Sequence, residues 1–148
     1  MIILDTNVVS EPIKPIPNAA VLNWLDAQEP QSLYLTTISL AELLAGVELL
    51  PTGRRKDVLK SSLAVQIETL FAGRILAFNA DVSEAFAVTN AAALSQGNSI
   101  SFPDCAIAAI ARVYGFAVAT RNVRDFRGTG VQVINPWEAG VNHARENH

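Results

Sequence analysis

The chain opens with the sequence MIILDTN (residues 1–7), in which three apolar residues lead into a carboxylate. A short continuous apolar run is typical of a strand that is buried on both faces of a parallel sheet. Asp5 would then lie at the carboxyl end of that strand, where open α/β sheets place their ligand crevices. A carboxylate beside buried residues costs free energy unless hydrogen bonds or a metal compensate it. The alternative is structural, since Asp is a favoured N-cap and a helix is expected from about Val8.

The composition describes a globular chain without a generally basic surface. Of 148 residues, 50% are hydrophobic and 17% are charged, which predicts one domain with a sizeable core. We expect this domain to span residues 1–140, followed by a loose tail over 141–148. With a net charge of −3, contact with a polyanion would need local cations or a bound metal. No apolar run approaches the ~20 residues that cross a membrane and no signal peptide is visible, so we expect a cytoplasmic protein.

The few histidines and cysteines exclude several kinds of active site. The single cysteine, Cys105, excludes an internal disulfide framework and a multi-cysteine zinc site. Both histidines, His143 and His148, lie in the last six residues. The folded body then has no histidine for a Ser-His-Asp triad, a three-histidine zinc site or an imidazole general base. Any catalysis must depend on carboxylates, amides, hydroxyls and cations.

Strand patterns alternate with helix patterns along the chain. Apolar periodicity, capping residues and terminal glycines or prolines predict helices over residues 19–28, 39–50, 54–71, 81–96 and 104–114. Short apolar runs predict strands over residues 2–4, 33–36, 75–78, 116–119 and 131–134. The proline-rich segment 11–17 and the polar segment 120–130 are predicted to be loops. This order predicts an α/β fold, a three-layer α/β/α sandwich whose central sheet is mostly parallel.

Three more carboxylates follow predicted strands, as Asp5 does. Glu42 lies early in a helix, although Ser39-x-x-Glu42 also matches a capping box. Asp104 lies in the first turn of another helix, where it would also stabilise the helix dipole without any further role. Asp125 lies in the loop after a late strand, where it could equally cap a turn or pair with a nearby arginine. Each acid has a structural explanation by itself, but all four are predicted at one edge of the sheet.

Carboxylates that converge repel one another, so such a cluster needs a cation. Oxygen ligands without His or Cys select a hard ion, Mg²⁺ or Mn²⁺. An ion of this kind activates water and stabilises charge during an in-line phosphoryl displacement. Four polar side chains close to the acids in the sequence are expected to orient them by hydrogen bonds, namely Thr6, Asn7, Thr120 and Asn122.

The segments that carry these acids match a known family. They read LDTN at residues 4–7, ISLAEL around Glu42, FPDCAIAA around Asp104, and ATRNVRDF at residues 119–126. In this order they resemble the PIN-domain ribonucleases, and most of all the VapC toxins of bacterial toxin–antitoxin pairs, in their FitB-like branch. The ending NPW at residues 135–137 also resembles that branch.

The resemblance implies an Mg²⁺- or Mn²⁺-dependent endoribonuclease. By position, Asp5 and Asp104 match the family's main metal ligands, and Glu42 matches the acid that binds metal or positions the attacking water. Some members carry an aspartate where Asn122 stands here. Either Asp125 takes the part of that fourth acid, or a second metal binds weakly. A site with one metal is compatible with both outcomes.

The resemblance also implies partners. Such a toxin is expected to be a homodimer inhibited by a small VapB/FitA-like antitoxin, with promoter DNA bound only through that antitoxin. An antitoxin arginine entering the acidic pocket would be a sensible inhibitory device. The apolar helices predicted over residues 19–28 and 39–50 could leave a groove for a partner peptide or a second subunit, although core packing explains most of their apolar residues.

Contact with RNA would depend on a few cations near the acids. Arg121, Arg124 and Arg127 lie in the same predicted loop as Asp125. A second basic cluster at residues 54–56 is better explained as a solvated helix start. The chain has no basic stripe interleaved with aromatic residues, so it does not resemble a single-strand binding platform.

Three other functions remain open at this point. A phosphoacceptor receiver domain clusters acids at a sheet edge, but it would need a lysine where Arg121 stands. A haloacid-dehalogenase-type phosphatase would need Asp-x-Asp after the first strand, where Asn7 replaces the second aspartate. The third is a non-enzymatic interaction module that binds a partner protein. Metal-dependent RNA cleavage that is lost in Asp5→Asn and Asp104→Asn would separate the nuclease from such a module.

Overall fold

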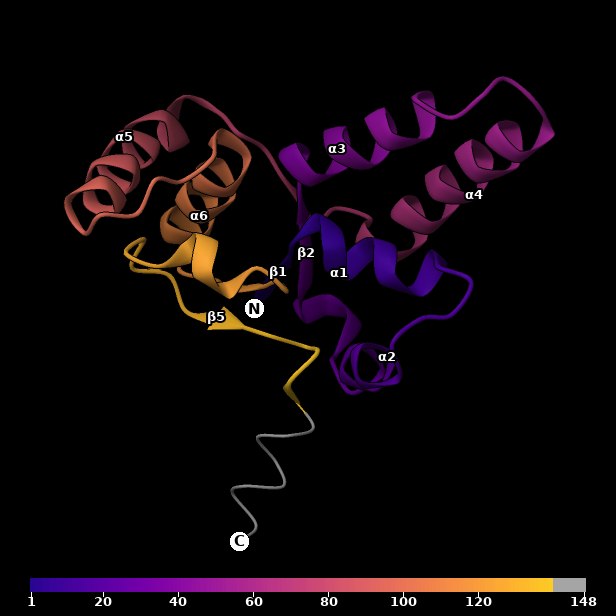
Figure 1. Cartoon of the computed structure of the whole chain (residues 1–148), viewed down its shortest axis with the longest axis horizontal. Helices are drawn as coiled ribbons and strands as arrows, with labels where there is room; N and C mark the ends of the chain where they lie inside the picture. The colour runs from indigo at the N-terminus through magenta and orange to yellow at the C-terminus, as the bar shows by residue number, and fades with distance from the viewer. Residues whose placement is uncertain (140–148) are drawn as a thin grey trace, which may run out of the picture.

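The computed structural model describes residues 1–139 and is built around a parallel sheet (Figure 1). Its strands are β1 (Ile2–Leu4), β2 (Leu33–Thr36), β3 (Ile75–Leu76), β4 (Ala117–Ala119) and β5 (Val133–Ile134). Its helices are α1 (Thr6–Ser10), α2 (Ala19–Asp26), α3 (Thr37–Glu48), α4 (Arg54–Phe71), α5 (Ala80–Ser95) and α6 (Phe102–Tyr114). Short 3₁₀ turns are η1 (Glu11–Ile13), η2 (Pro30–Ser32) and η3 (Val123–Phe126). The predicted α/β sandwich is confirmed.

All neighbouring strands run parallel in the order β3-β2-β1-β4-β5. The strand β1 is central, with Ile2 opposite Leu33 on one side and opposite Ala117 on the other. The chain builds outward from β1 through β2 to β3, and then returns to place β4 on the opposite side of β1. The order therefore reverses between β1 and β4, and open α/β sheets bind ligands beyond the carboxyl ends of the strands at such a switch point.

Helices cover both faces of the sheet and form two separate cores. Figure 1 shows α5 and α6 together on one side, and α1 to α4 on the other. Alternate residues of each strand point to opposite faces. Ile3 and Val118 accordingly pack in the core under α6, whereas Leu4 and Ala119 pack in the core with α1, α3 and α4. The one-residue alternation explains why the apolar runs in these short strands are continuous.

Several predicted boundaries were wrong, for local reasons. The helix predicted from Ser39 begins at Thr37, because the side chain of Thr36 accepts the amide N–H of Ser39 and so caps the helix. The capping box is therefore wrong, and Glu42 lies in the second turn. Within the predicted loop 11–17, Pro12 occupies the first turn of η1, where its missing N–H is tolerated.

The remaining differences concern the ends of elements. The strands β3, β4 and β5 are shorter than predicted, because an apolar run does not by itself show where inter-strand pairing stops. The polar loop 120–130 contains η3. The tail predicted to be loose, residues 141–148, lies outside the described residues.

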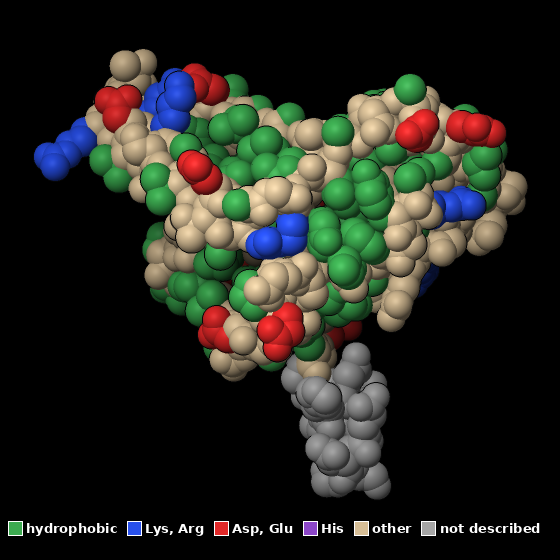
Figure 2. Space-filling view, turned by 180° about the vertical axis from the view of Figure 1, so that it is seen from behind, with side chains coloured by type: hydrophobic (Ala, Val, Ile, Leu, Met, Phe, Trp, Pro, Cys, Tyr) green, Lys and Arg blue, Asp and Glu red, His purple; other side chains and the backbone are tan. Residues whose placement is uncertain are grey.

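The surface of this single chain leaves many hydrophobic side chains uncovered. Figure 2 shows the face opposite to that of Figure 1, where hydrophobic side chains form a patch near the centre of the molecule with isolated charges around it. Large exposed hydrophobic residues in α4, in α3 and directly after α3 include Leu44, Leu49, Val58, Val65 and Leu70. Contiguous apolar surface of this kind often marks a protein interface. No helix within residues 1–139 has the length and apolar character to cross a membrane.

Candidate active site

The side chain of Asp5 is the centre of the site, at the switch point between β1 and β4. It is only 5% exposed, directly after β1, and it caps α1 by accepting the Thr6 amide at 2.8 Å. Its other oxygen accepts the Thr120 hydroxyl at 2.8 Å and the Asn7 amide at 3.5 Å. The main chain is tied down as well, since the Asp5 amide donates to the carbonyl of Ala119. Asp5 is thus both the helix cap and the buried acid that the sequence left open.

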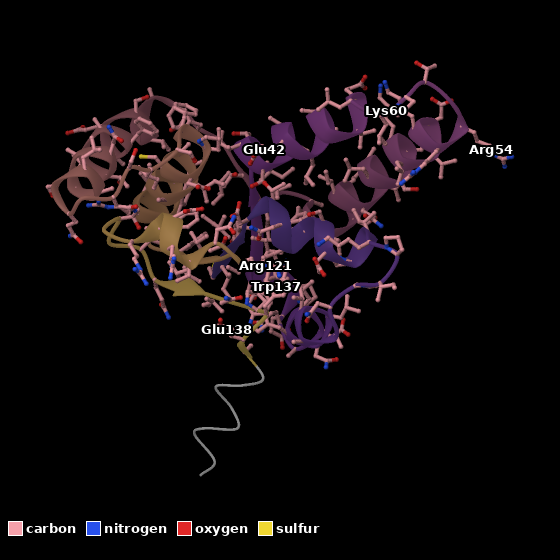
Figure 3. All side chains as sticks on the ribbon, in the orientation of Figure 1. Glu42, Arg54, Lys60, Arg121, Trp137 and Glu138 are labelled. Atoms are coloured by element: carbon pink, nitrogen blue, oxygen red, sulfur yellow. The ribbon has the colours of Figure 1, made fainter. Side chains whose placement is uncertain are left out.

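Glu42 is connected to Asp5 through a single residue. The hydroxyl of Thr6 donates to one Glu42 carboxylate oxygen at 2.9 Å, while the Thr6 amide donates to Asp5. Glu42 itself is exposed, in α3, and Figure 3 shows it near the beginning of that helix. Thr6 therefore holds the two carboxylates at the same end of the sheet, although they are 37 positions apart in the chain.

Asp104 and Asp125 approach Asp5 from the other side. Asp104 lies in the first turn of α6, which Ser101 caps by accepting the Asp104 amide at 3.3 Å. Asp125 lies in η3, just beyond β4, and is exposed. The structure therefore places all four predicted acids at one edge, with Asp5 and Asp104 on the same side of the molecule.

The electrostatics of the site reflect burial and crowding. Burial raises the pKa of Asp5 above its ordinary value, and the charges of Glu42 and Asp125 raise it further, against the hydrogen bonds from Thr120 and Thr6, which lower it. Burial also raises the pKa of the half-buried Asp104, and the charges of Asp5 and Asp125 add to that shift, whereas its hydrogen bond with Ser101 opposes it. These aspartates have no positive partner in the described part of the chain, where ion pairs form elsewhere.

The donor set suits a hard cation. It consists of oxygen atoms alone, and a nearby positive charge would relieve the repulsion that raises the pKa of both Asp5 and Asp104. Within residues 1–139, however, no group of three His, Cys, Asp or Glu side chains converges closely enough to hold an ion. The described residues therefore form no complete carboxylate cage, and Mg²⁺, which usually keeps several waters, is the ion that such a sparse set of oxygen donors suits.

The polar residues predicted to orient the acids behave differently from one another. Thr6 and Thr120 donate strong hydrogen bonds to the acids, whereas the Asn7 contact with Asp5 is long. Asn122 contributes its main chain, because its amide N–H donates to the Thr120 hydroxyl at 3.0 Å. No side-chain contact from Asn122 to an acid is present in the described residues.

Two residues near the site were missed by the sequence reasoning. Glu11, directly after α1, is 4% exposed and pairs with Lys14 at 2.8 Å. Trp137 lies under the guanidinium of Arg121, whose Cζ is 5.2 Å from the centre of the ring, and Figure 3 shows the two side by side. The motif NPW drew attention to Trp137 only as part of a resemblance, whereas the i,i+3 spacing of Glu11 and Lys14 was a local signal for their ion pair.

Comparisons with known proteins agree with this arrangement. The family model described as "PIN domain" matches residues 2–131. The plasmid stability protein StbB of Pseudomonas syringae is 48% identical over 139 residues, covering 94% of this chain and 100% of StbB. The VapC ribonuclease Y4jK of Sinorhizobium fredii and the toxin FitB of Neisseria gonorrhoeae are each 44% identical, covering 93% of this chain and 99% of each relative.

A solved structure shows the same fold. One chain in the structure of FitAB bound to an IR36 DNA fragment has a TM-score of 0.89 to this chain, with 43% identity, covering 93% of this chain and 96% of that one. The matched family and the long, closely similar relatives confirm the resemblance that the motifs predicted. The chain belongs to the PIN-domain family.

Proposed function

We propose that this protein is a metal-dependent endoribonuclease, the toxin of a VapBC-type toxin–antitoxin pair. The nuclease activity is supported by membership of the PIN-domain family and by the similarity to a VapC ribonuclease. The toxin role is supported by the similarity to FitB. The proposed substrate is cellular RNA, so the proposal keeps the cytoplasmic location expected from the sequence.

One observation carries the proposal. Burial raises the pKa values of Asp5 and Asp104, which are 99 positions apart, and the charge of Asp5 raises that of Asp104 further, without a cationic partner for either. Carboxylates with raised pKa values at a ligand-binding edge are typical of functional sites. A structural pair of acids would instead be compensated by lysine or arginine, as Glu11 is by Lys14.

We assign the metal, Mg²⁺ or Mn²⁺, to Asp5 and Asp104. When bound, such an ion lowers the pKa of a water molecule and stabilises charge on a phosphate. Thr120 and Thr6 orient Asp5 through their hydrogen bonds. Because Thr6 occupies one Glu42 oxygen, the other is available to orient the attacking water and to accept its proton.

The fourth acidic position remains shared between two candidates. Asp125 carries a charge that raises the pKa values of Asp5 and Asp104, whereas Asn122 stands where some family members carry an aspartate. We propose that Asp125 adds negative charge at the edge of the site, and that Asn122 acts by fixing Thr120 through its main chain. The exposed arginines of the same loop, Arg121, Arg124 and Arg127, are the proposed RNA contacts.

The proposed partners are a second copy of the chain and a VapB/FitA-like antitoxin, with promoter DNA bound only through the antitoxin. A groove of about 470 Å³ between α1, α3 and α4 supports this proposal. Its walls are mostly apolar, with Leu43, Val47, Leu59 and Leu63, and its lining also includes Glu42. A peptide in this groove would reach the acids, where an arginine could pair with them.

The test is RNA cleavage by the purified full chain with Mn²⁺ or Mg²⁺ and with a chelator. Wild-type protein should cleave only with metal, and Asp5→Asn and Asp104→Asn should each lose at least ~100-fold, since even residues that only orient metal ligands contribute 10–100-fold. Glu138→Gln, which changes an exposed acid, is the matched control. Equal cleavage by wild-type protein and both aspartate variants would rule out the assignment.

The second candidate is a PIN-like module that binds a partner without catalysis. It is favoured by the failure of any three acids within residues 1–139 to converge on one point. This alternative predicts no metal-dependent cleavage by wild-type protein and full binding of the partner by Asp5→Asn. The cleavage assay therefore separates the two functions.

A further inference from the structure

The NPW motif at residues 135–137 has no part in the chemistry proposed above, yet it forms a defined structure. It follows β5 directly, at the same edge of the sheet as the acids. The Trp137 amide donates to the Asn135 side chain at 3.0 Å, and Pro136 is buried. The indole of Trp137 packs on the core formed with α1, α3 and α4. Three residues thus place one aromatic ring in a fixed orientation.

The residue above that ring, Arg121, is tied to the acids through its main chain. Its amide N–H donates to the Asn7 side chain at 3.3 Å, and Asn7 in turn contacts Asp5. The preceding residue, Thr120, donates to the same Asp5 oxygen. The hydrogen bonds through Asn7 and through Thr120 therefore both hold the Arg121 backbone in place relative to Asp5.

The side chain of Arg121 is oriented but its charge is not neutralised. The guanidinium lies 5.2 Å from the centre of the Trp137 ring, a favourable cation–π distance. Among residues 1–139, Arg121 forms no ion pair within 4 Å. The nearby acid Glu11 is already bound by Lys14 and by the amide of Asn18. Arg121 remains exposed and free to bind an anion.

We propose that Arg121 binds a phosphate of the RNA strand next to the one that is cleaved, and that Trp137 is a positioning residue that acts through Arg121. This inference rests on the proposed function, because it names RNA as the anion. A chain with a net charge of −3 and four acids at its site needs a local cation to hold a polyanion. Arg124 and Arg127 lie in the same loop, but neither stands over an aromatic ring in the described residues.

The experiment measures kcat and KM for a short labelled single-stranded RNA with Mn²⁺, at several salt concentrations. Arg121→Gln should raise KM about tenfold with little change in kcat, because a phosphate contact away from the reacting bond binds ground and transition states alike. It should also reduce the salt dependence of log(1/KM) by about 0.7, the value for one phosphate contact with a single strand. Arg54→Gln, an exposed arginine at the start of α4, is the matched control and should leave KM unchanged.

Trp137 is tested by a cycle of variants. Trp137→Leu should raise KM about threefold. Trp137→Phe should have a KM close to that of wild-type protein, because phenylalanine keeps a ring under the guanidinium. In the Arg121→Gln background, Trp137→Leu should have no further effect on the salt dependence. Partial unfolding of Trp137→Leu lowers the active fraction and kcat, but it leaves this slope unchanged, so the slope isolates the positioning role.

Several results would overturn the inference. Wild-type cleavage combined with an unchanged KM and salt slope in Arg121→Gln removes Arg121 from the RNA interface. If Arg121→Gln instead weakens inhibition by the antitoxin alone, the guanidinium binds the protein partner and not RNA. If Trp137→Leu changes KM and the salt slope equally in the wild-type and Arg121→Gln backgrounds, Trp137 has a structural role only. A wild-type protein that cleaves no RNA rejects the proposed function itself, and the inference with it.

Discussion

Two carboxylates on either side of α1 are buried to the same extent and behave in opposite ways. Asp5 is 5% exposed and has a raised pKa, whereas Glu11 is 4% exposed and has a lowered pKa. The hydrogen-bonded Lys14 lowers the pKa of Glu11 most, and the amide of Asn18 adds to the effect. Asp5 has hydrogen-bond donors but no cation, and its neighbours are other acids.

The difference shows how to tell a structural buried acid from a functional one. Glu11 joins η1 to the start of α2, because it accepts the amide of the cap residue Asn18 at 3.0 Å, so its charge is used within the fold. The charge of Asp5 is compensated only in part, which leaves the site ready for a cation. The solvent-exposed fraction alone does not distinguish the two, but their partners do.

The largest effect expected from this comparison concerns metal binding. Mn²⁺ at 100 times its Kd should raise the free energy of unfolding of wild-type protein by about 2.7 kcal/mol. Asp5→Asn should lose this stabilisation, while Glu11→Gln should keep it. Denaturant unfolding with and without Mn²⁺ measures both variants. Retained stabilisation in Asp5→Asn would show that the ion binds elsewhere.

A smaller effect is expected from the hydroxyl that orients Asp5. Thr120→Val removes the 2.8 Å hydrogen bond to Asp5 with almost no change in volume. Metal affinity or RNA cleavage should fall by about 10- to 100-fold, as for other residues that orient metal ligands. Isothermal titration with Mn²⁺ and a cleavage assay provide the two measurements. Thr52→Val, at an exposed position, is the control and should behave like wild-type protein.

The assignment of Glu42 to the site can be tested through helix stability. Thr36→Ala removes the cap of α3 and should lower the free energy of unfolding by about 1 kcal/mol. Glu42→Gln should leave this stability within about 0.5 kcal/mol of wild type, as expected for a surface change, while reducing RNA cleavage. Urea unfolding of the two variants decides the matter. A loss of stability in Glu42→Gln as large as that in Thr36→Ala would show that Glu42 has a structural role, through its hydrogen bond with Thr6.

The smallest effect is the pH dependence of stability in a chelator. Glu11 has a lowered folded pKa, so its contribution is complete above its unfolded pKa of about 4.3 and is lost as pH falls through the folded value. Asp5 has a raised folded pKa, so its protonated form favours the fold, and stability gains as pH falls from that value toward about 3.9. Glu11→Gln should therefore flatten the loss of stability in acid, and Asp5→Asn should remove the opposing gain. Unfolding curves between about pH 3 and 7 would test both signs; equal slopes in the two variants would contradict the comparison.

The sequence by itself was sufficient to predict the order of the elements and to single out the four acids as candidates. The boundaries of β1, β2 and α4 were predicted to the residue, because a continuous apolar run, a run before a polar helix start, and a stretch between two glycines are all local signals. The positions of Asp5, Glu42, Asp104 and Asp125 after strands followed from the same patterns. The rule that parallel strands end at one edge predicted that these acids share that edge, although no three of them within residues 1–139 come close enough to hold an ion.

The tertiary structure alone decided which partners each of these residues has. The cap of α3 is Thr36 and not the predicted Ser39, because β2 ends at Thr36 and the helix begins directly after it. Asp5 accepts a hydrogen bond from Thr120, 115 residues away in the chain. The guanidinium of Arg121 lies over the ring of Trp137 at the carboxyl edge of the sheet. A local pattern reports which residues share a face, but charge compensation depends on which side chains meet when distant strands pair. Glu11 differs here, because its partners Lys14 and Asn18 are near it in the sequence, whereas the partner of Asp5, Thr120, comes from a distant strand end.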